Sequence, residues 1–168
     1  TLAITVSPVN DAPVNTLPAA RTTDVDQQVL FLPTQVAVAD ADAGAAQLEV
    51  SLAATDGVVS LGGTPGLTFL AGDGRDDTAM TFRGTLTRVN SALNNMRFRP
   101  DPGFEGVATV TLTTNDLGNT GASGALTDTD IVLITVGSPA SPDTPDEQDD
   151  ADATAALLET QRHAATQP

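Results

Sequence analysis

The segment VATVTLTT (residues 107–114) gives the strongest indication of fold class, because its side chains alternate in character. In an extended chain, Val110 and Leu112 point to one face, whereas Thr109 and Thr111 point to the other. A period of two is typical of an antiparallel strand that covers a core with one face and meets water with the other. The segment therefore predicts a half-buried β-strand.

Eight further runs have the composition of short strands, and segments rich in Gly, Pro, Asp and Asn separate them. They are LAITV (2–6), QVLFL (28–32), QVAVA (35–39), QLEVSLAA (47–54), LTFLA (67–71), AMTFRG (79–84), MRFR (96–99) and DIVLITV (130–136). Many short strands at this spacing predict an all-β fold, an antiparallel β-sandwich. The phenylalanines at 69, 82, 98 and 104 are expected to pack in its core.

One segment, GTLTRVNSALNNM, has a different period. Leu86, Val89 and Leu93 recur at helical spacing, and either Thr85 or Thr87 is placed to cap the start of a helix. We predict one short helix that crosses between strands.

The composition excludes several classes of function. The chain has 168 residues, no Cys, Lys, Trp or Tyr, and a single histidine, His163. Zinc sites built from several histidines and hydrolases that depend on a histidine base are therefore excluded within this chain. Binding of neutral sugars or bases by aromatic stacking is disfavoured, because few rings are present.

The net charge of −15 opposes binding to nucleic acid or to anionic membranes, and it is compatible with cations. No apolar run approaches the roughly 20 residues that cross a bilayer, so we expect no membrane insertion. Carboxylates alone could serve a glycosidase, but no second type of catalytic group accompanies them. We therefore expect that the chain is not an enzyme.

The chain divides into three parts. LAITVSP (2–8) matches VLITVGSP (132–139), which suggests that residues 1–9 are the last strand of a preceding repeat and a linker. Residues 10–137 would then form one β-sandwich repeat. Residues 138–168 are rich in Pro, Ser and acidic side chains without apolar periodicity, and we expect a disordered acidic tail.

Several of these segments together resemble a known family. They are VNDAPV (9–14), DADAG (40–44), GLTFLAGDGRDDTAMTFRGTLTRVNSALNNMRFRPDPGFEG (66–106) and VTLTTNDLGNTGASGALTDTDIVLITV (110–136). The chain is similar to the bacterial cadherin-like tandem repeats, the VCBS and dystroglycan-type cadherin-like modules of large secreted surface proteins and adhesins.

The resemblance implies a Greek-key β-sandwich in a tandem array, with Ca²⁺ bound at the junctions between repeats. VNDAP is similar to the cadherin linker, which makes Asn10 and Asp11 candidate ligands. DADAG is similar to the cadherin Asp-x-Asp motif, which makes Asp40 and Asp42 candidate ligands.

Other acidic loops are candidates on chemical grounds, because Ca²⁺ takes six to eight oxygens from carboxylates, amides, carbonyls and water. These loops contain Asp73 and Asp76, and Asp116 together with Asp128. The alternative is that Asp and Asn stand there because they form turns with their own backbone.

The expected function is that of a calcium-stabilised structural or adhesive repeat in a large secreted or cell-surface bacterial protein. Its partners would be neighbouring repeats of the same chain and cell-surface or matrix ligands, and its location extracellular. The alternative is a ligand-binding module, for example for carbohydrate, or an accessory module appended to a secreted enzyme.

Overall fold

The computed structural model describes residues 7–122 and 124–137. The expected strand at 2–6 and the expected acidic tail at 138–168 lie outside the described residues. The described part contains one helix, α1 (Leu86–Leu93), and the strands β1 (Val14–Thr16), β2 (Arg21–Asp24), β3 (Val29–Leu30), β4 (Ala37–Ala39), β5 (Gln47–Ala54), β6 (Gly57–Ser60), β7 (Thr68–Ala71), β8 (Ala79–Thr85), β9 (Arg97–Pro100), β10 (Gly106–Asn115) and β11 (Thr127–Gly137). Within residues 7–122 and 124–137, the helix α1 is not long and apolar enough to span a membrane.

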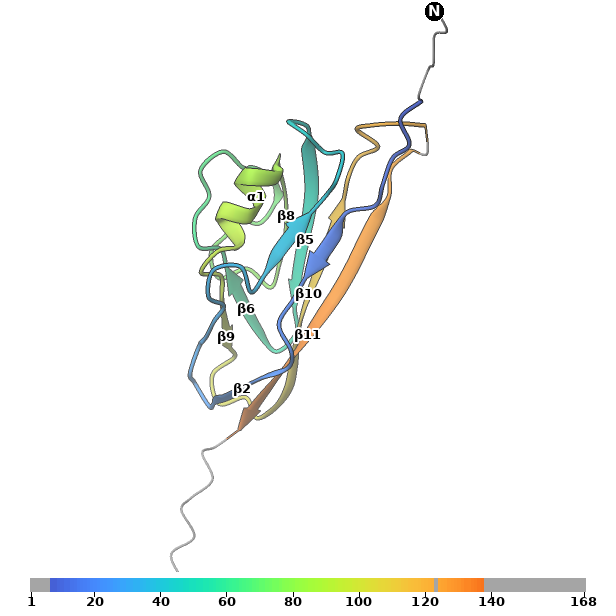
Figure 1. Cartoon of the computed structure of the whole chain (residues 1–168). Coiled ribbons are helices and arrows are strands. Elements are labelled where there is room, and N and C mark those ends of the chain that lie inside the picture. The colour runs from blue at the N-terminus through green and yellow to red at the C-terminus, as the bar shows by residue number, and fades with distance from the viewer. Residues whose placement is uncertain (1–6, 123, 138–168) are drawn as a thin grey trace, which may run out of the picture. The chain divides into compact units, whose positions relative to one another are not determined.

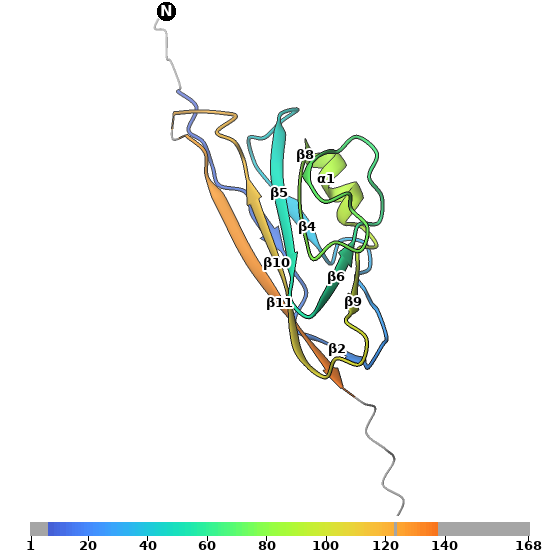
Figure 2. The ribbon, with the colours of Figure 1, turned by 180° about the vertical axis from the view of Figure 1, so that it is seen from behind.

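The strands form two layers, which confirms the expected all-β sandwich (Figures 1 and 2). One layer is a six-stranded sheet in the order β2-β11-β10-β5-β8-β7. The other contains the three-stranded sheet β3-β9-β6 and the pair β1-β4. Strands β5 and β10 are neighbours although four strands separate them in the chain, so the chain crosses repeatedly between layers.

Strand β10 lies at the centre of the large sheet and carries the alternation that the sequence indicated. Val110, Leu112 and Thr114 are buried, whereas Val107 is exposed. Its register against β11 extends over the whole strand, from Gly106 to Asn115. This strand therefore supplies both the middle of the sheet and a continuous part of the core.

The helix begins and ends where its apolar spacing predicts, and Val89, Ala92 and Leu93 are buried. Thr85 occupies the N-cap position, but its hydroxyl makes no capping hydrogen bond. The helix is therefore held by packing of its apolar face rather than by its cap.

The phenylalanines that were expected in the core differ in how deeply they are buried. Phe82 and Phe98 are fully buried, and Phe69 and Phe104 are partly buried against the same core. Phe31, which was not assigned to the core beforehand, is also fully buried.

Three strands were not predicted, namely β1, β2 and β6. Each has four residues or fewer, and β2 consists of the polar residues RTTD. β2 forms because it pairs in parallel with the end of β11, a contact between segments more than 100 residues apart. Such short strands leave no periodicity for a sequence analysis to detect.

The two ends of the folded unit lie far apart. Residues 7–13 lie at the end that also carries the loop between β10 and β11, whereas β11 finishes at the opposite end (Figure 1). This arrangement suits a domain that is joined to others in series.

Leu93→Ala is expected to lower the free energy of unfolding by about 2–5 kcal/mol, because the fully buried side chain would leave a cavity. Leu133→Ala is the matched control: Leu133 is 48% exposed on β11, so its truncation should change stability by less than about 0.5 kcal/mol. Urea denaturation followed by circular dichroism measures both. Equal stability of the two variants would contradict the placement of α1 against the core.

Candidate metal site

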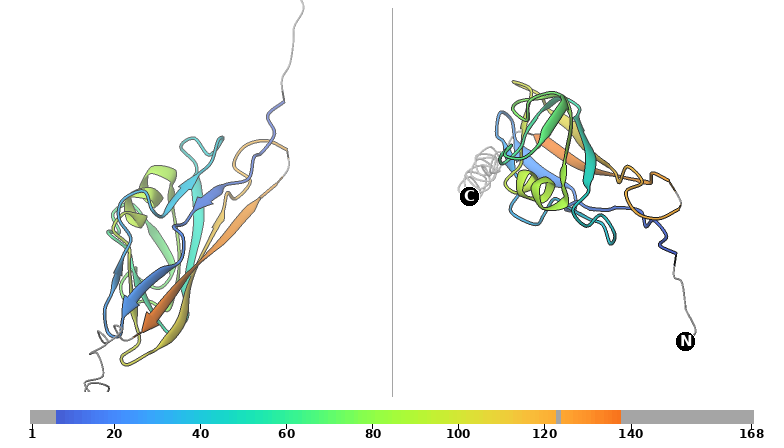
Figure 3. Two further views of the ribbon diagram at one scale, coloured as in Figure 1. Left: turned by 60° about the horizontal axis from the view of Figure 1, so that its bottom comes forward. Right: turned by 90° about the horizontal axis from the view of Figure 1, so that it is seen from above.

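Three segments that are distant in sequence meet at one end of the sandwich: the linker at residues 9–11, the β4–β5 loop and the β10–β11 loop (Figure 3). The backbone N–H of Asp11 donates to Asp42 Oδ2 at 3.2 Å. The hydroxyl of Thr120 donates to the carbonyl of Asp42 at 2.9 Å. Gly121 lies so close to the backbone of Val9 and Asn10 that a Cβ atom would clash there. The linker is therefore packed against both loops.

Asn10 is the most deeply buried residue of the linker, with 5% of its surface exposed. Its side-chain amide donates to Asp116 Oδ2 at 2.6 Å and to the carbonyl of Gly124 at 2.8 Å. Its carbonyl oxygen, Oδ1, is buried and has no hydrogen-bond partner. One half of this side chain is thus fixed, and the other half presents an unsatisfied acceptor.

Asp116 is 1% exposed, and it holds Asn10 in this orientation. Its Oδ1 accepts hydrogen bonds from the backbone N–H groups of Gly118 and Leu126, both at 2.8 Å. Burial alone would raise the pKa of this carboxyl, but the hydrogen bonds from Leu126, Gly118 and Asn10 outweigh burial and lower it. Asp116 is therefore a stably ionised structural acceptor.

Asp40 resembles Asn10 in having one satisfied oxygen and one unsatisfied oxygen. Its Oδ1 accepts from the N–H groups of Asp42 at 3.1 Å and Ala43 at 2.9 Å. Its Oδ2 is buried without a partner. Burial raises the pKa of Asp40, and the nearby carboxylate of Asp42 raises it further. The site therefore holds negative charge that no basic side chain among the described residues neutralises.

These features fit a hard cation. In the described part of the chain, three buried side-chain atoms lack a partner, and two of them are the oxygens of Asn10 and Asp40. An oxygen that is buried without a donor is costly unless an ion or water completes it. Ca²⁺ accepts amide and carbonyl oxygens as well as carboxylates. Among residues 7–122 and 124–137, no three acidic or histidine side chains cluster as a metal site. The amide of Asn10 would therefore have to be part of the ligand set.

Asp11 contributes its backbone to this cluster, while its side chain is exposed. Asp73 and Asp76 lie elsewhere, in the turn between β7 and β8. Asp73 Oδ1 accepts from the N–H of Arg75 at 2.9 Å, and Asp76 Oδ1 accepts from the hydroxyl of Ser60 and pairs with Arg99 at 3.3 Å. Both carboxylates therefore have protein partners.

Asp128 also lies outside the cluster, on β11, where it joins β1 to the large sheet. Its Oδ2 accepts from the N–H of Asn15 at 2.7 Å. The buried side chain of Asn15 in turn donates to the carbonyls of Leu112 and Asp128 and accepts from the hydroxyl of Thr114. Asn15 has no signal in the sequence, because an isolated Asn in a loop-like segment carries no pattern.

Comparison with known proteins identifies no family. No protein-family model matches the chain, and no curated protein matches it. Among solved structures, the chain is similar to a nucleoside hydrolase-related hypothetical protein from Saccharophagus degradans that is associated with carbohydrate metabolism. The sequence identity is 13% and the TM-score 0.40, and the match covers 76% of this chain and 26% of that protein. The chain thus matches about a quarter of the length of that structure.

The two carboxylates at this end should respond oppositely to substitution in a calcium-free buffer with chelator. The pKa of Asp40 is higher in the folded than in the unfolded chain, so its ionisation opposes folding. Asp40→Asn should therefore raise the free energy of unfolding at pH 7. This gain should shrink as the pH falls through the raised pKa and vanish below 3.8.

Asp116→Asn should instead lower the free energy of unfolding at pH 7 by about 1–3 kcal/mol, because it replaces Oδ2, which accepts from the buried amide of Asn10, with an NH2 group that cannot accept. Since the folded-state pKa is lowered, the loss should diminish as the pH falls below 3.8. Urea denaturation between pH 2.5 and pH 7 measures both differences. The same sign for both variants at pH 7 would contradict this account of the site.

Proposed function

We propose that this domain is a calcium-stabilised structural or adhesive repeat of a large secreted or cell-surface bacterial protein, as its resemblance to cadherin-like repeats implies. The observation that carries the proposal is the pair of buried, unpartnered oxygens of Asn10 and Asp40 where the linker meets two loops. The proposal assigns no catalytic step to the domain.

Calcium would be held by Asn10 and Asp40, with Asp42 beside them and Asp116 fixing the orientation of the Asn10 amide. The ion would supply positive charge to oxygens that now lack a donor. Because Asn10 belongs to the linker and Asp40 to the body of the sandwich, one ion held by both would fix the linker to the domain. Pro13 restricts the backbone just after the linker.

A fixed linker gives the repeat a mechanical role. The described unit begins at one end of the sandwich and finishes at the other, so copies joined in series would extend in one direction (Figure 1). Asp11 is exposed, so its carboxylate would be available to the neighbouring repeat. Calcium would then turn a flexible string of sandwiches into a rod-like spacer.

Calcium should raise the melting temperature, and chelation should lower it by several degrees without loss of β-structure. Extracellular modules bind Ca²⁺ with dissociation constants of about 0.1–1 mM, so about 1 mM Ca²⁺ would stabilise the fold by about 0.4–1.4 kcal/mol per site. Asp40→Asn should abolish the shift. Asp101 lies on the β9–β10 loop, and Asp101→Asn should keep the calcium-induced shift.

Circular dichroism melts and calorimetric titration measure these effects. If Asp40→Asn responds to calcium as strongly as the unaltered protein does, the ion is bound elsewhere. If neither responds to 10 mM Ca²⁺, the calcium proposal fails.

Asp11→Ala should affect only a tandem of repeats. Two copies can be joined from Val136 of the first to Ser7 of the second, which keeps the spacing of the internal match. Alanine retains the backbone N–H that donates to Asp42, so a single domain should melt within about 1 °C of the unaltered protein. In the calcium-loaded tandem, the same change in the second copy should shorten the maximum dimension measured by solution X-ray scattering.

The same tandem measured with chelator gives the maximum dimension of a junction that no calcium ion fixes. If the tandem gives the same scattering with calcium, with chelator and with Asp11→Ala, the rod mechanism is wrong.

A further inference from the structure

The backbones of the linker and of the β10–β11 loop approach each other closely at Gly121. A Cβ atom on this residue would lie 2.5 Å from the carbonyl carbon of Val9 and against the backbone nitrogen of Asn10. Glycine is the residue that allows two backbones to come this close. Backbone atoms cannot rotate aside as the end of a side chain can, so a larger residue here would displace either the linker or the loop.

The loop is held in place directly before Gly121. The hydroxyl of Thr120 donates to the carbonyl of Asp42 at 2.9 Å, and the amide of Asn119 donates to the carbonyl of Gln47 at 2.6 Å. Both hydrogen bonds tie the loop to the segment that leads into β5. A Cβ atom at position 121 would therefore displace the linker more readily than the loop.

Polar contacts hold the linker against the loop. The side-chain amide of Asn10 donates to Asp116 and to the carbonyl of Gly124, and the N–H of Asp11 donates to Asp42. Apolar packing at Val9 adds little, because this residue is 65% exposed. Since hydrogen bonds depend steeply on distance and angle, a small displacement of the linker would break them and move Asn10 Oδ1.

We propose that Gly121 is the positioning residue that allows the linker to dock on the sandwich, and that docking of the linker controls the calcium affinity of the site. This inference rests on the proposed calcium function, and it names the regulation of that site. An ion that binds only the docked linker holds the linker in place, and displacement of the linker weakens calcium binding by the same factor. The β10–β11 loop thus sets the calcium affinity of the junction through a residue that has no side chain to bind the ion.

Gly121→Ala in the full chain tests the proposal by two measurements. Calorimetric titration with CaCl2 should show an affinity at least tenfold weaker than that of the unaltered protein. NMR in 1 mM EDTA should show displaced resonances of the Asn10 side-chain amide, and its protons should exchange with water at least tenfold faster. The second measurement needs no calcium, so it reports the docking of the linker by itself.

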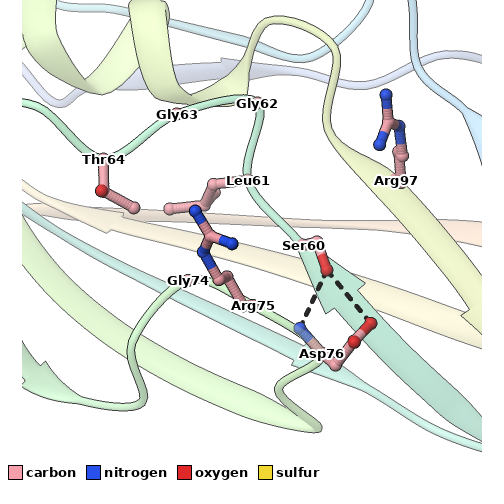
Figure 4. Close-up of a pocket in the computed structure, with 9 residues that line it drawn as sticks. All are labelled: Ser60, Leu61, Gly62, Gly63, Thr64, Gly74, Arg75, Asp76 and Arg97. Carbon is pink, nitrogen blue, oxygen red and sulfur yellow. Dashed lines mark hydrogen bonds between the residues drawn. The ribbon is translucent and has the colours of Figure 1, made fainter.

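Gly74→Ala is the matched control for backbone strain and crowding. Gly74 has a φ of 86°, against 91° at Gly121, and a Cβ atom there would lie 2.9 Å from the side chain of Thr64. Both residues line a cavity beside β6, and no residue of that cavity belongs to the linker or to the two loops that hold it (Figure 4). Gly74→Ala should therefore leave the calcium affinity and the exchange rate of the Asn10 amide within twofold.

Gly124→Ala separates strain from crowding within the loop itself. Gly124 has a φ of 73°, but a Cβ atom there would have no neighbour within 4 Å. This variant should keep the calcium affinity within threefold. If Gly121→Ala does not fold, Thr120→Val takes its place, because it removes the hydrogen bond that holds the loop and should weaken the affinity at least threefold.

Calcium binding by Gly121→Ala within twofold of the unaltered protein would overturn the inference and leave the proposed function standing. Equal losses in Gly121→Ala and Gly124→Ala would also overturn it, because strain in the loop would then explain the effect. If the unaltered protein binds no calcium, the proposed function fails and the coupling fails with it. The exchange of the Asn10 amide in EDTA then still decides whether Gly121 docks the linker.

Discussion

One end of this domain depends on the hydrogen bond between the amide of Asn10 and the buried carboxylate of Asp116. Asp116 fixes the β10–β11 loop by accepting from two backbone N–H groups, and it fixes the linker through Asn10. Without that carboxylate, the linker would lose its shortest hydrogen bond to the sandwich, and the N–H groups of Gly118 and Leu126 would lose their acceptor. The candidate metal site exists because this bond holds Asn10 with its carbonyl oxygen free.

Among the aspartates at the turns and junctions described above, two kinds differ in their hydrogen-bond partners rather than in their residue type. Asp73, Asp77, Asp116 and Asp128 accept hydrogen bonds from backbone N–H groups and thereby shape turns and junctions. Asp40 also shapes its own turn, but it retains a buried oxygen without a partner. Only an acidic residue of this second kind offers a cation an oxygen that no donor of the protein already occupies.

Period-two alternation in VATVTLTT and helical spacing in Leu86–Leu93 were enough to predict the β-sandwich class, the helix and most long strands, because these patterns are local. The sequence also pointed to Asn10, Asp40 and Asp42, through a resemblance. It did not separate them from Asp73 and Asp128, because each of these residues reads as an acid or amide near a turn. Folding separates them: the donors to Asp116 and Asp128 come from residues up to 113 positions away, and whether an oxygen finds a donor depends on such distant contacts.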